Sequence, residues 1–178
     1  MNRFSLAVYP GSFDPIHAGH IAVLKQALEV FDQVIILVAD NPGKTYQCPH
    51  GIRTNLIHEY LNTGDLAGCN GNECIVRCTS KPLAEFCRDN SINFVVRGLR
   101  NGTDLDYEES QQYFVTKMLP ELTYTFFTVP PIYREISSSS LRQFAKLSTL
   151  AEFDRAYWPD ERACEGLAGH IHQIYRKK

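Results

Sequence analysis

Hydroxyl and imidazole side chains follow directly on the first apolar run of the chain. The stretch LAVYPGSFDPIHAGHIAVL covers residues 6–24, and its apolar part ends at Tyr9 before a polar turn that carries Ser12, His17 and His20. Helical spacing resumes after the turn, which places these side chains where a strand joins a helix. A helix N-terminus offers free N–H groups and a partial positive charge, so an anion can bind beside them. The competing interpretation is a plain turn with two surface histidines.

Two arginines follow a later apolar run, INFVV. In VVRGLRNGTDLDYEE, Arg97 and Arg100 stand on what the pattern predicts to be a tight loop. Guanidinium groups spaced in this way form a fork that suits phosphate oxygens. The alternative is a structural network in which the two arginines pair with Asp104, Asp106 or Glu108.

A lysine and a run of serines complete the set of candidate phosphate ligands. Lys44 in NPGK follows an apolar run and a Pro-Gly turn, a place where a single lysine is usually only solvated. In REISSSSLRQF, residues 137–140 open a predicted helix and Arg142 follows shortly after. Hydroxyls and backbone amides at a helix start can form a nest for phosphate, whereas serine runs in other settings are flexible linkers. The flanking strand and helix favour the nest.

Strands and helices alternate along the chain, and this alternation predicts how the four segments meet. Apolar runs typical of buried strands cover about 3–9, 33–39, 73–78, 92–96 and 122–129, and helices are expected at about 20–31, 53–61, 82–90, 104–119 and 137–147. The pattern predicts an α/β fold: a Rossmann-like, doubly wound sheet of about five parallel strands with helices on both faces. Ligands bind such sheets at the carboxyl ends of the strands, near the point where the strand order reverses. We therefore expect the candidate phosphate ligands at one edge of the sheet.

Length and composition bound the class of protein. The 178 residues fit a single domain, with a core over about 3–147 and a helical extension over about 149–178. The hydrophobic share of 44% and the net charge of −2 are typical of a globular protein and give no sign of a nucleic-acid or anionic-membrane partner. No stretch reads as a signal peptide, and no apolar run approaches the roughly 20 residues of a membrane-spanning helix. These features lead us to expect a cytoplasmic protein.

Cysteine spacing gives a weaker signal. The six cysteines are Cys48, Cys69, Cys74, Cys78, Cys87 and Cys164. Without a secretory signal, reduced thiols are expected. The cluster from 69 to 87 contains no CxxC pair, so small buried thiols are favoured over a metal site, which stays the alternative. Cys74 and Cys78 alternate along a predicted strand and should share one face.

Taken together, the four motifs resemble the HxGH nucleotidyltransferase superfamily. Residues 17–20 (HAGH) are similar to its (H/T)xGH signature, and residues 136–142 are similar to its ISSTxIR-type signature. Within that superfamily, YPGSFDP, NPGK, RGLR and DLDYE are most similar to bacterial phosphopantetheine adenylyltransferases. The resemblance runs from about Ala7 to Leu147.

The resemblance implies transfer of AMP from ATP to 4′-phosphopantetheine, which gives dephospho-coenzyme A and pyrophosphate in coenzyme A biosynthesis. It implies His20 as the stabiliser of the transition state, with Ser12, Lys44 and Arg100 as further catalytic residues. By the same resemblance, the acceptor would be bound by Ser12, Lys44, Leu83 and Arg97. ATP would be bound by Ser12, Phe13, His17, His20, Gly98, Leu99, Arg100, Glu108, Tyr133, Ile136, Ser137, Ser138, Ser139 and Arg142. It also implies Mg²⁺ held through the ATP phosphates without a protein ligand, and a homo-oligomer, most similar enzymes being hexamers.

The match is closer on the ATP side than on the acceptor side. Val115 stands where the family commonly has an Asn that touches the pantetheine arm, and Glu135 takes the place of an aromatic residue. His17 replaces a Thr, and residues 62–72 form an insertion. Two alternatives therefore stay open: a related HxGH enzyme with another acceptor, such as nicotinamide mononucleotide or the acceptor of a cytidylyltransferase, and a nucleotide-binding sensor without turnover.

Overall fold

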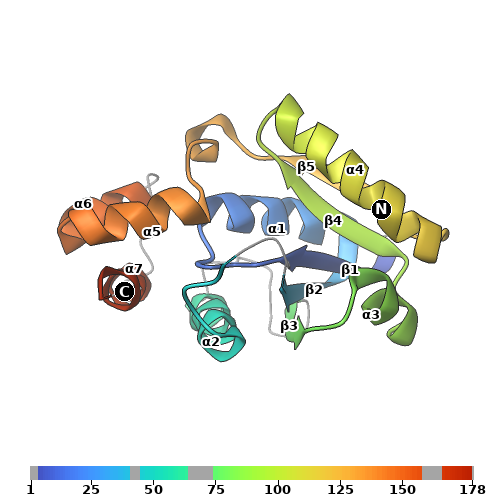
Figure 1. Ribbon diagram of the computed structural model, residues 1–178, viewed down its shortest axis with the longest axis horizontal. Coiled ribbons are helices and arrows are strands. Elements are labelled where there is room, and N and C mark those ends of the chain that lie inside the picture. Colours follow the sequence, from blue (N-terminus) through green and yellow to red (C-terminus); the bar gives the residue numbers. More distant parts are fainter. Residues whose placement is uncertain (1–3, 41–44, 64–73, 158–165, 178) are drawn as a thin grey trace.

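Five parallel strands form the centre of the molecule (Figure 1). The computed structural model describes residues 4–40, 45–63, 74–157 and 166–177. The strands are β1 (Phe4–Gly11), β2 (Phe31–Ala39), β3 (Cys74–Thr79), β4 (Phe94–Leu99) and β5 (Thr123–Thr128). They are ordered β3-β2-β1-β4-β5, and every neighbouring pair is parallel. This confirms the predicted α/β class with a doubly wound sheet.

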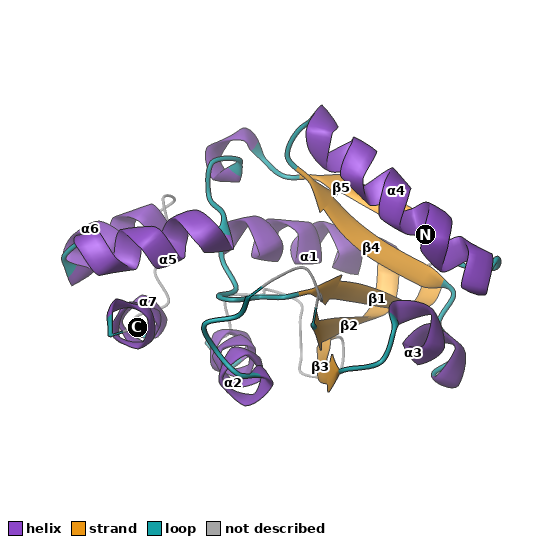
Figure 2. Cartoon of the chain, in the orientation of Figure 1, coloured by secondary structure: helices purple, strands orange, loops and turns teal. Residues whose placement is uncertain are grey.

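Helices follow the strands in alternation (Figure 2). They are α1 (Ala18–Val30), α2 (His50–Leu61), α3 (Leu83–Asp89), α4 (Gly102–Met118), α5 (Ser138–Leu147), α6 (Leu150–Tyr157) and α7 (Leu167–Arg176), with a 3-10 turn at Pro131–Tyr133. Figure 1 shows α5, α6 and α7 gathered at one end of the molecule and α3 and α4 at the other. The arrow of β1 points towards α5, so the carboxyl ends of the strands face the end that carries the C-terminal helices.

Alternating side chains on the strands divide the core between the two faces of the sheet. On β2, Val34, Ile36 and Val38 belong to one cluster, which includes residues of α1, α2, α5, α6 and α7. Ile35 and Leu37 belong to a second cluster, which includes residues of α3. Successive side chains of a strand point to opposite faces, so a strand covered on both faces reads as one continuous apolar run. That is why QVIILVA is apolar almost throughout.

The point where the strand order reverses lies between β1 and β4. From β1 the chain moves to β2 and then β3 on one side, and it returns through β4 and β5 on the other side of β1. Diverging connections on either side of such a point leave a crevice outside the carboxyl ends of the central strands. The cleft described below lies at this place.

Several boundaries differ from the sequence prediction, among them those of β4, α1 and β2. β4 continues through Leu99 because it pairs with β5 as far as Thr128, so Arg97 belongs to a strand and not to a tight loop. Helix α1 begins at Ala18, before His20 and not at it, and β2 begins directly where α1 ends. Tertiary pairing sets these limits, and single-sequence patterns do not contain it.

The cysteine prediction was right for three of the described positions and wrong for a fourth. Cys48, Cys74 and Cys87 are buried, whereas Cys78 is exposed on β3. Cys78 lies near the end of β3, the strand at the edge of the sheet, where little covers it. Cys69 and Cys164, like most of the predicted insertion 62–72, lie outside the described residues. Within the described part of the chain, no group of three or more His, Cys, Asp or Glu side chains is placed to hold a metal ion.

The C-terminal helices pack as part of the first cluster. Phe153 and Tyr157 on α6 and Ile171 and Tyr175 on α7 are each 0% exposed and share that cluster with α1. α7 packs against α5, α6 and α2. The predicted helical extension is therefore helical over α6 and α7 and contributes buried side chains to the main core. None of the helices in the described ranges is both long and apolar enough to cross a bilayer.

Candidate nucleotide site

One cleft is lined by the candidate phosphate ligands that the structure describes: Ser12, His17, His20, Arg97, Arg100, Ser137, Ser138, Ser139 and Arg142. It has a volume of about 480 Å³, which is in the range of small-molecule sites. It lies at the carboxyl ends of β1 and β4 and is bounded by the N-terminal ends of α1, α4 and α5. Its walls are formed by Tyr9, Pro10, Gly11, Ser12, Phe13, Asp14, His17, Gly19, His20, Val23, Thr45, Tyr46, Arg97, Gly98, Arg100, Asp104, Tyr107, Glu108, Val129, Ile136, Ser137, Ser138, Ser139 and Arg142. Three helix N-termini and several cationic side chains thus border the same space.

The two histidines of the first motif stack on each other at the start of α1. His17 is the N-cap residue, and its backbone N–H donates to Nδ1 of His20 at 3.3 Å. Because Nδ1 of His20 accepts this bond, we assign the ring proton to Nε2. The ring centroids of the two histidines are 3.7 Å apart. Gly19 permits this contact, since a Cβ there would lie 3.1 Å from Cε1 of His17.

His17 is held neutral by its surroundings. Its side chain is buried, and burial, followed by the charges of His20 and Arg100, lowers its pKa well below 6.5. Its Nδ1 is buried without a hydrogen-bond partner among the described residues. A buried polar atom without a partner costs stability, and a bound ligand would remove that cost.

Replacing His17 with threonine should reduce the loss of stability on acidification. As the pH falls through about 6.5, the unfolded histidine takes up a proton while the native one does not, so the free energy of unfolding falls by at most about 1.4 kcal/mol per pH unit. Urea denaturation of His17→Thr at about pH 7 and about pH 5.5 should show a smaller drop than the unsubstituted protein, since this proton is no longer involved. His58→Thr, on the exposed side of α2, is the control. An equal decrease in the free energy of unfolding of the unsubstituted protein and of His17→Thr would contradict the conclusion that native His17 stays neutral.

Arg97 is anchored between β1 and α4. Its Nη1 donates to the carbonyl of Pro10 at 3.0 Å, and its Nε lies 2.9 Å from a carboxylate oxygen of Glu108. The side chains are 21% and 15% exposed, so the pair is partly shielded from water. Among the described residues, Nη2 of Arg97 makes no hydrogen bond, which leaves its two N–H groups for a ligand. The alternative that the sequence left open, pairing of the arginines with acidic residues of the next helix, is therefore present in the structure.

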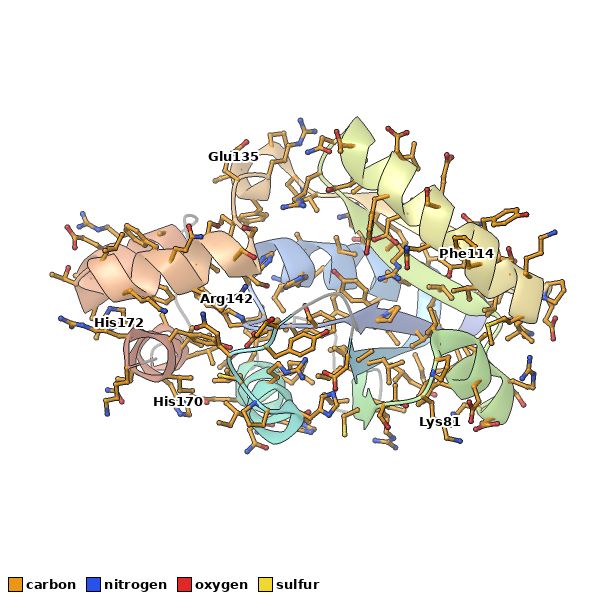
Figure 3. All side chains as sticks on the ribbon, viewed as in Figure 1. Lys81, Phe114, Glu135, Arg142, His170 and His172 are labelled. Atoms are coloured by element: carbon orange, nitrogen blue, oxygen red, sulfur yellow. The ribbon has the colours of Figure 1, made fainter. Side chains whose placement is uncertain are left out.

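Arg100 makes a bidentate pair with Asp104 at the start of α4. Nε and Nη2 donate to the two carboxylate oxygens at 2.9 and 3.0 Å, and the backbone N–H of Arg100 donates as well, at 3.0 Å. These bonds raise the pKa of Arg100 and lower that of Asp104. The charge of Glu135, an exposed carboxylate labelled in Figure 3, raises the Arg100 pKa further. Arg100 still lines the cleft.

The serine run caps α5 and contacts the first motif. Ser137 is the N-cap residue and accepts from the backbone N–H of Ser140 at 3.1 Å. The hydroxyl of Ser138 donates to the carbonyl of Pro15, and Arg142 donates to Ser139 and to the carbonyl of Asp14. Arg142, labelled in Figure 3, thus lies where α5 meets the loop between β1 and α1. Residues 137–139, at the start of α5, line the cleft, which is the position that a phosphate nest would occupy.

A tight contact explains the glycine at position 98. A Cβ there would lie 2.7 Å from Cγ2 of Val23, closer than such atoms ever approach. Helix α1 therefore packs against β4 with only a hydrogen between them. This close approach places the start of α1 beside the end of β4, and it brings His20 and Arg97 to the same cleft.

Sequence reasoning missed a buried arginine that holds the first motif. Arg53 on α2 is 1% exposed, and it donates to the carbonyl of Ser12 at 2.7 Å, to that of Cys48 at 3.0 Å and to Asp40 at 2.9 Å. A signal was present, since Arg53 shares the helical spacing of the buried Leu56, Ile57 and Tyr60. An arginine on the apolar side of a helix indicates a buried charge with partners.

Arg53→Met should destabilise the protein by about 3 kcal/mol, because three acceptors lose a charged donor inside the core. For a chain of this size, that loss corresponds to a fall in melting temperature of roughly 6–12 °C. Scanning calorimetry of Arg53→Met and of Arg77→Met, an exposed arginine on β3, supplies the measurement and its control. If the two variants melted at the same temperature, the hydrogen bonds of Arg53 would not stabilise the fold as its contacts indicate.

Several predicted site residues do not line the cleft. Leu83 opens α3 and packs against the second cluster, on the other face of the sheet from α1. Tyr133 packs against the first cluster, and Leu99 ends β4. Lys44 lies outside the described residues. Sequence reasoning did not select several residues that line the same cleft, among them the polar or aromatic Asp14, Thr45, Tyr46 and Tyr107 and the apolar Val129.

Comparison with known proteins agrees with this geometry. The model of the cytidylyltransferase-like family matches residues 8–144. A phosphopantetheine adenylyltransferase from Chelativorans sp. is 36% identical over 141 residues, which make up 79% of this chain and 84% of that protein. Proteins of the same name from Alkaliphilus metalliredigens and Brucella anthropi are 33% and 35% identical, and the matches cover 85% and 86% of their lengths.

Solved structures with a similar fold include adenylyltransferases of another kind. The nicotinic acid mononucleotide adenylyltransferase of Plasmodium falciparum complexed with NaAD has a TM-score of 0.67 at 15% identity, over 97% of this chain and 96% of that one. A bifunctional NMN adenylyltransferase/ADP ribose pyrophosphatase from Francisella tularensis has a TM-score of 0.66 at 17% identity, over 98% of this chain and 51% of that one. At such identities the likeness shows the fold alone.

Proposed function

The chain belongs to the cytidylyltransferase-like family and, within it, to the phosphopantetheine adenylyltransferases, and from this premise we propose that it transfers AMP from ATP to 4′-phosphopantetheine. The products are dephospho-coenzyme A and pyrophosphate. The observation that carries the proposal is the cleft, into which the starts of α1 and α5 and the side chains of His20, Arg97 and Arg142 all converge. Such an arrangement suits a polyphosphate substrate.

The ATP half of the reaction needs positioning and charge stabilisation more than covalent chemistry. A phosphate oxygen of the acceptor attacks the α-phosphorus of ATP, and the bond to pyrophosphate breaks. In this mechanism Nε2–H of His20 donates to the α-phosphate, where negative charge grows as the transition state forms. The residues from Ser137 to Ser139 and Arg142 would hold the β- and γ-phosphates, with Arg100 beside them. The acceptor phosphate is already ionised at neutral pH, so no general base is required.

The acceptor half would begin at Arg97. The two N–H groups on Nη2 of Arg97 remain available, and Lys44 and Ser12 would complete the site for the acceptor phosphate. Leu83, Val115 and Tyr124 pack against the second cluster, outside the lining of the cleft. The pantetheine arm would have to leave the cleft to reach this apolar surface and its one phenol group. The Tyr124 hydroxyl is buried without a partner among the described residues, and burial raises its pKa to about 12. It would therefore stay protonated and able to donate.

We propose that Mg²⁺ accompanies ATP and is bound by its phosphates. The three carboxylates that line the cleft are each paired within the chain: Asp14 with Tyr175, Asp104 with Arg100, and Glu108 with Arg97. None of the three thus offers an unpaired ligand, and this fits an ion coordinated by phosphate oxygens and water. When bound, the ion would neutralise charge on the leaving pyrophosphate.

We further propose a cytoplasmic homo-oligomer, hexameric as the family resemblance implies. Helix α4 has no buried residue and exposes Tyr113, Phe114 and Met118, each more than half exposed. Phe114, labelled on α4 in Figure 3, is 67% exposed. Apolar side chains gathered on one helix are typical of a surface that another subunit covers. Light scattering coupled to gel filtration would measure the mass directly.

A panel of acceptors tests the proposed function. Pyrophosphate release would be measured with ATP or CTP and with 4′-phosphopantetheine, nicotinamide mononucleotide or nicotinic acid mononucleotide. We expect release only with ATP and 4′-phosphopantetheine. Release only with a mononucleotide would show that the acceptor is not 4′-phosphopantetheine. Release only with CTP would show that the nucleotide substrate is not ATP. ATP binding without release from any acceptor would instead indicate a nucleotide sensor.

A further inference from the structure

Two tyrosine hydroxyls from the C-terminal helices reach the loop between β1 and α1. The phenol of Tyr157, on α6, donates to the carbonyl of Ile16 at 2.6 Å. The phenol of Tyr175, on α7, donates to Oδ1 of Asp14 at 2.5 Å. The partners are 141 and 161 residues apart in the sequence, and both tyrosines are 0% exposed. Neither tyrosine lines the cleft, so neither is placed to touch a substrate there.

Asp14 is the centre of these contacts. It is 1% exposed, and its Oδ2 accepts from the backbone N–H of Gln47 at 3.0 Å. Its carbonyl accepts from Arg142. Burial, followed by the bond to Asp14, raises the pKa of Tyr175, so the phenol keeps its proton and is the donor of the pair. A buried carboxylate needs such donors, because an unsatisfied lone pair there costs more than a hydrogen bond gains.

The loop held in this way has a backbone conformation that needs support. Phe13, next to Asp14, has a φ of 46°, in the left-handed region that non-glycine residues rarely adopt. Its ring is 1% exposed and packs edge-on against the ring of His20, with the centroids 4.9 Å apart. A shift of Asp14 would therefore be passed through Phe13 to the imidazole that lines the cleft.

We propose that Tyr157 and Tyr175 are positioning residues for the nucleotide site: their hydroxyls fix the loop from Ser12 to His17, and they thereby set the position of His20. The kinetic part of this inference rests on the proposed function, whereas the structural part does not. Both tyrosines lie beyond residue 144, where the match to the family model ends. The C-terminal segment thus has a role in the reaction as well as in the core.

The test removes one hydroxyl and keeps the ring. Tyr175→Phe leaves Oδ1 of Asp14 without its donor, and we expect turnover to fall about tenfold, since a bond to a charged group is lost and the loop moves. The KM for ATP should change less than about threefold, because the groups on α5 still bind the nucleotide. Backbone amides of residues 12–17 should exchange with deuterium at least about tenfold faster, measured by mass spectrometry. Tyr157→Phe is the second variant and should act in the same direction.

His172→Gln is the matched control. His172 lies on α7 one turn before Tyr175, is 4% exposed, and its Nε2 is 3.0 Å from the carbonyl of Ser148, away from the loop (Figure 3). This variant should melt at a lower temperature but keep the turnover and the loop exchange of the unsubstituted protein. If His172→Gln and Tyr175→Phe lowered turnover equally, or if neither tyrosine variant changed loop exchange, the inference would be overturned. An unsubstituted protein that is inactive with every acceptor would contradict the proposed function, and faster loop exchange in Tyr175→Phe would then still support the positioning role.

Discussion

His20→Ala should lower turnover by about 100- to 1,000-fold while changing the dissociation constant of ATP by less than about threefold. In the proposed mechanism the ring donates from Nε2 to the α-phosphate, where charge develops only as the reaction proceeds, so its contribution is larger in the transition state than in the bound substrate. In the same proposal, ground-state binding of ATP depends instead on the start of α5 and on Arg142, which line the cleft. Steady-state kinetics and titration calorimetry measure the two quantities separately.

The substitution also removes a helix cap, and this effect has to be separated from catalysis. Nδ1 of His20 accepts from the N–H of His17, so alanine should cost about 1 kcal/mol of stability as well. His20→Asn supplies a side-chain oxygen for that bond and serves as the comparison. We expect the asparagine variant to melt close to the unsubstituted protein but to remain at least about tenfold slower in turnover. Equal losses of turnover and of ATP affinity in the alanine variant would contradict the role assigned to His20 in the transition state.

Arg97→Ala should reduce kcat/KM for the acceptor by about 1,000-fold. The variant loses the guanidinium that we propose binds the acceptor phosphate, a group that makes charge-assisted bonds of about 1.5–3 kcal/mol each. It also leaves the carboxylate of Glu108, 15% exposed, without its partner in the same cleft, where it would repel an anionic substrate. Arg88→Ala, an exposed arginine on α3, is the control for loss of positive charge.

A double variant separates the two consequences of removing Arg97. In Arg97→Ala/Glu108→Gln the uncompensated charge is gone, so the melting temperature should rise above that of the single variant. The acceptor kcat/KM should recover by less than about tenfold, because the phosphate still lacks its donor. Full recovery in the double variant would mean that Arg97 only neutralises Glu108 and does not bind the acceptor.

Much of the fold was predictable because the strands are buried on both faces. Continuous apolar runs such as QVIILVA identify β2 without knowledge of its neighbours, and the alternation with helical spacing leads to a parallel sheet. Boundaries were less predictable. β4 extends to Leu99 only because β5 pairs with it to Thr128, and the sequence of one strand does not contain the length of its neighbour.

The candidate site was predictable at its motifs and not at their supports. Ser12, His20, Arg97 and Arg142 were selected by residue type and by position after a strand, and the structure brings all four to one cleft. The pairing of Arg97 with Glu108 was one of two alternatives that the sequence left open. The contact between Tyr175 and Asp14 was not predicted, because a bond across 161 residues leaves no periodic signal in either segment.

The sequence by itself determined the order of the elements and the chemistry at the end of each strand, because both follow from local spacing and residue type. Only the tertiary structure decided which donors are already engaged and which remain for a ligand. That outcome depends on distances of about 3 Å between segments far apart in the chain, and such distances are set by packing. The close contact of Gly98 with Val23 and the buried hydrogen bonds of Arg53 and Tyr175 are packing features that position the loop between β1 and α1.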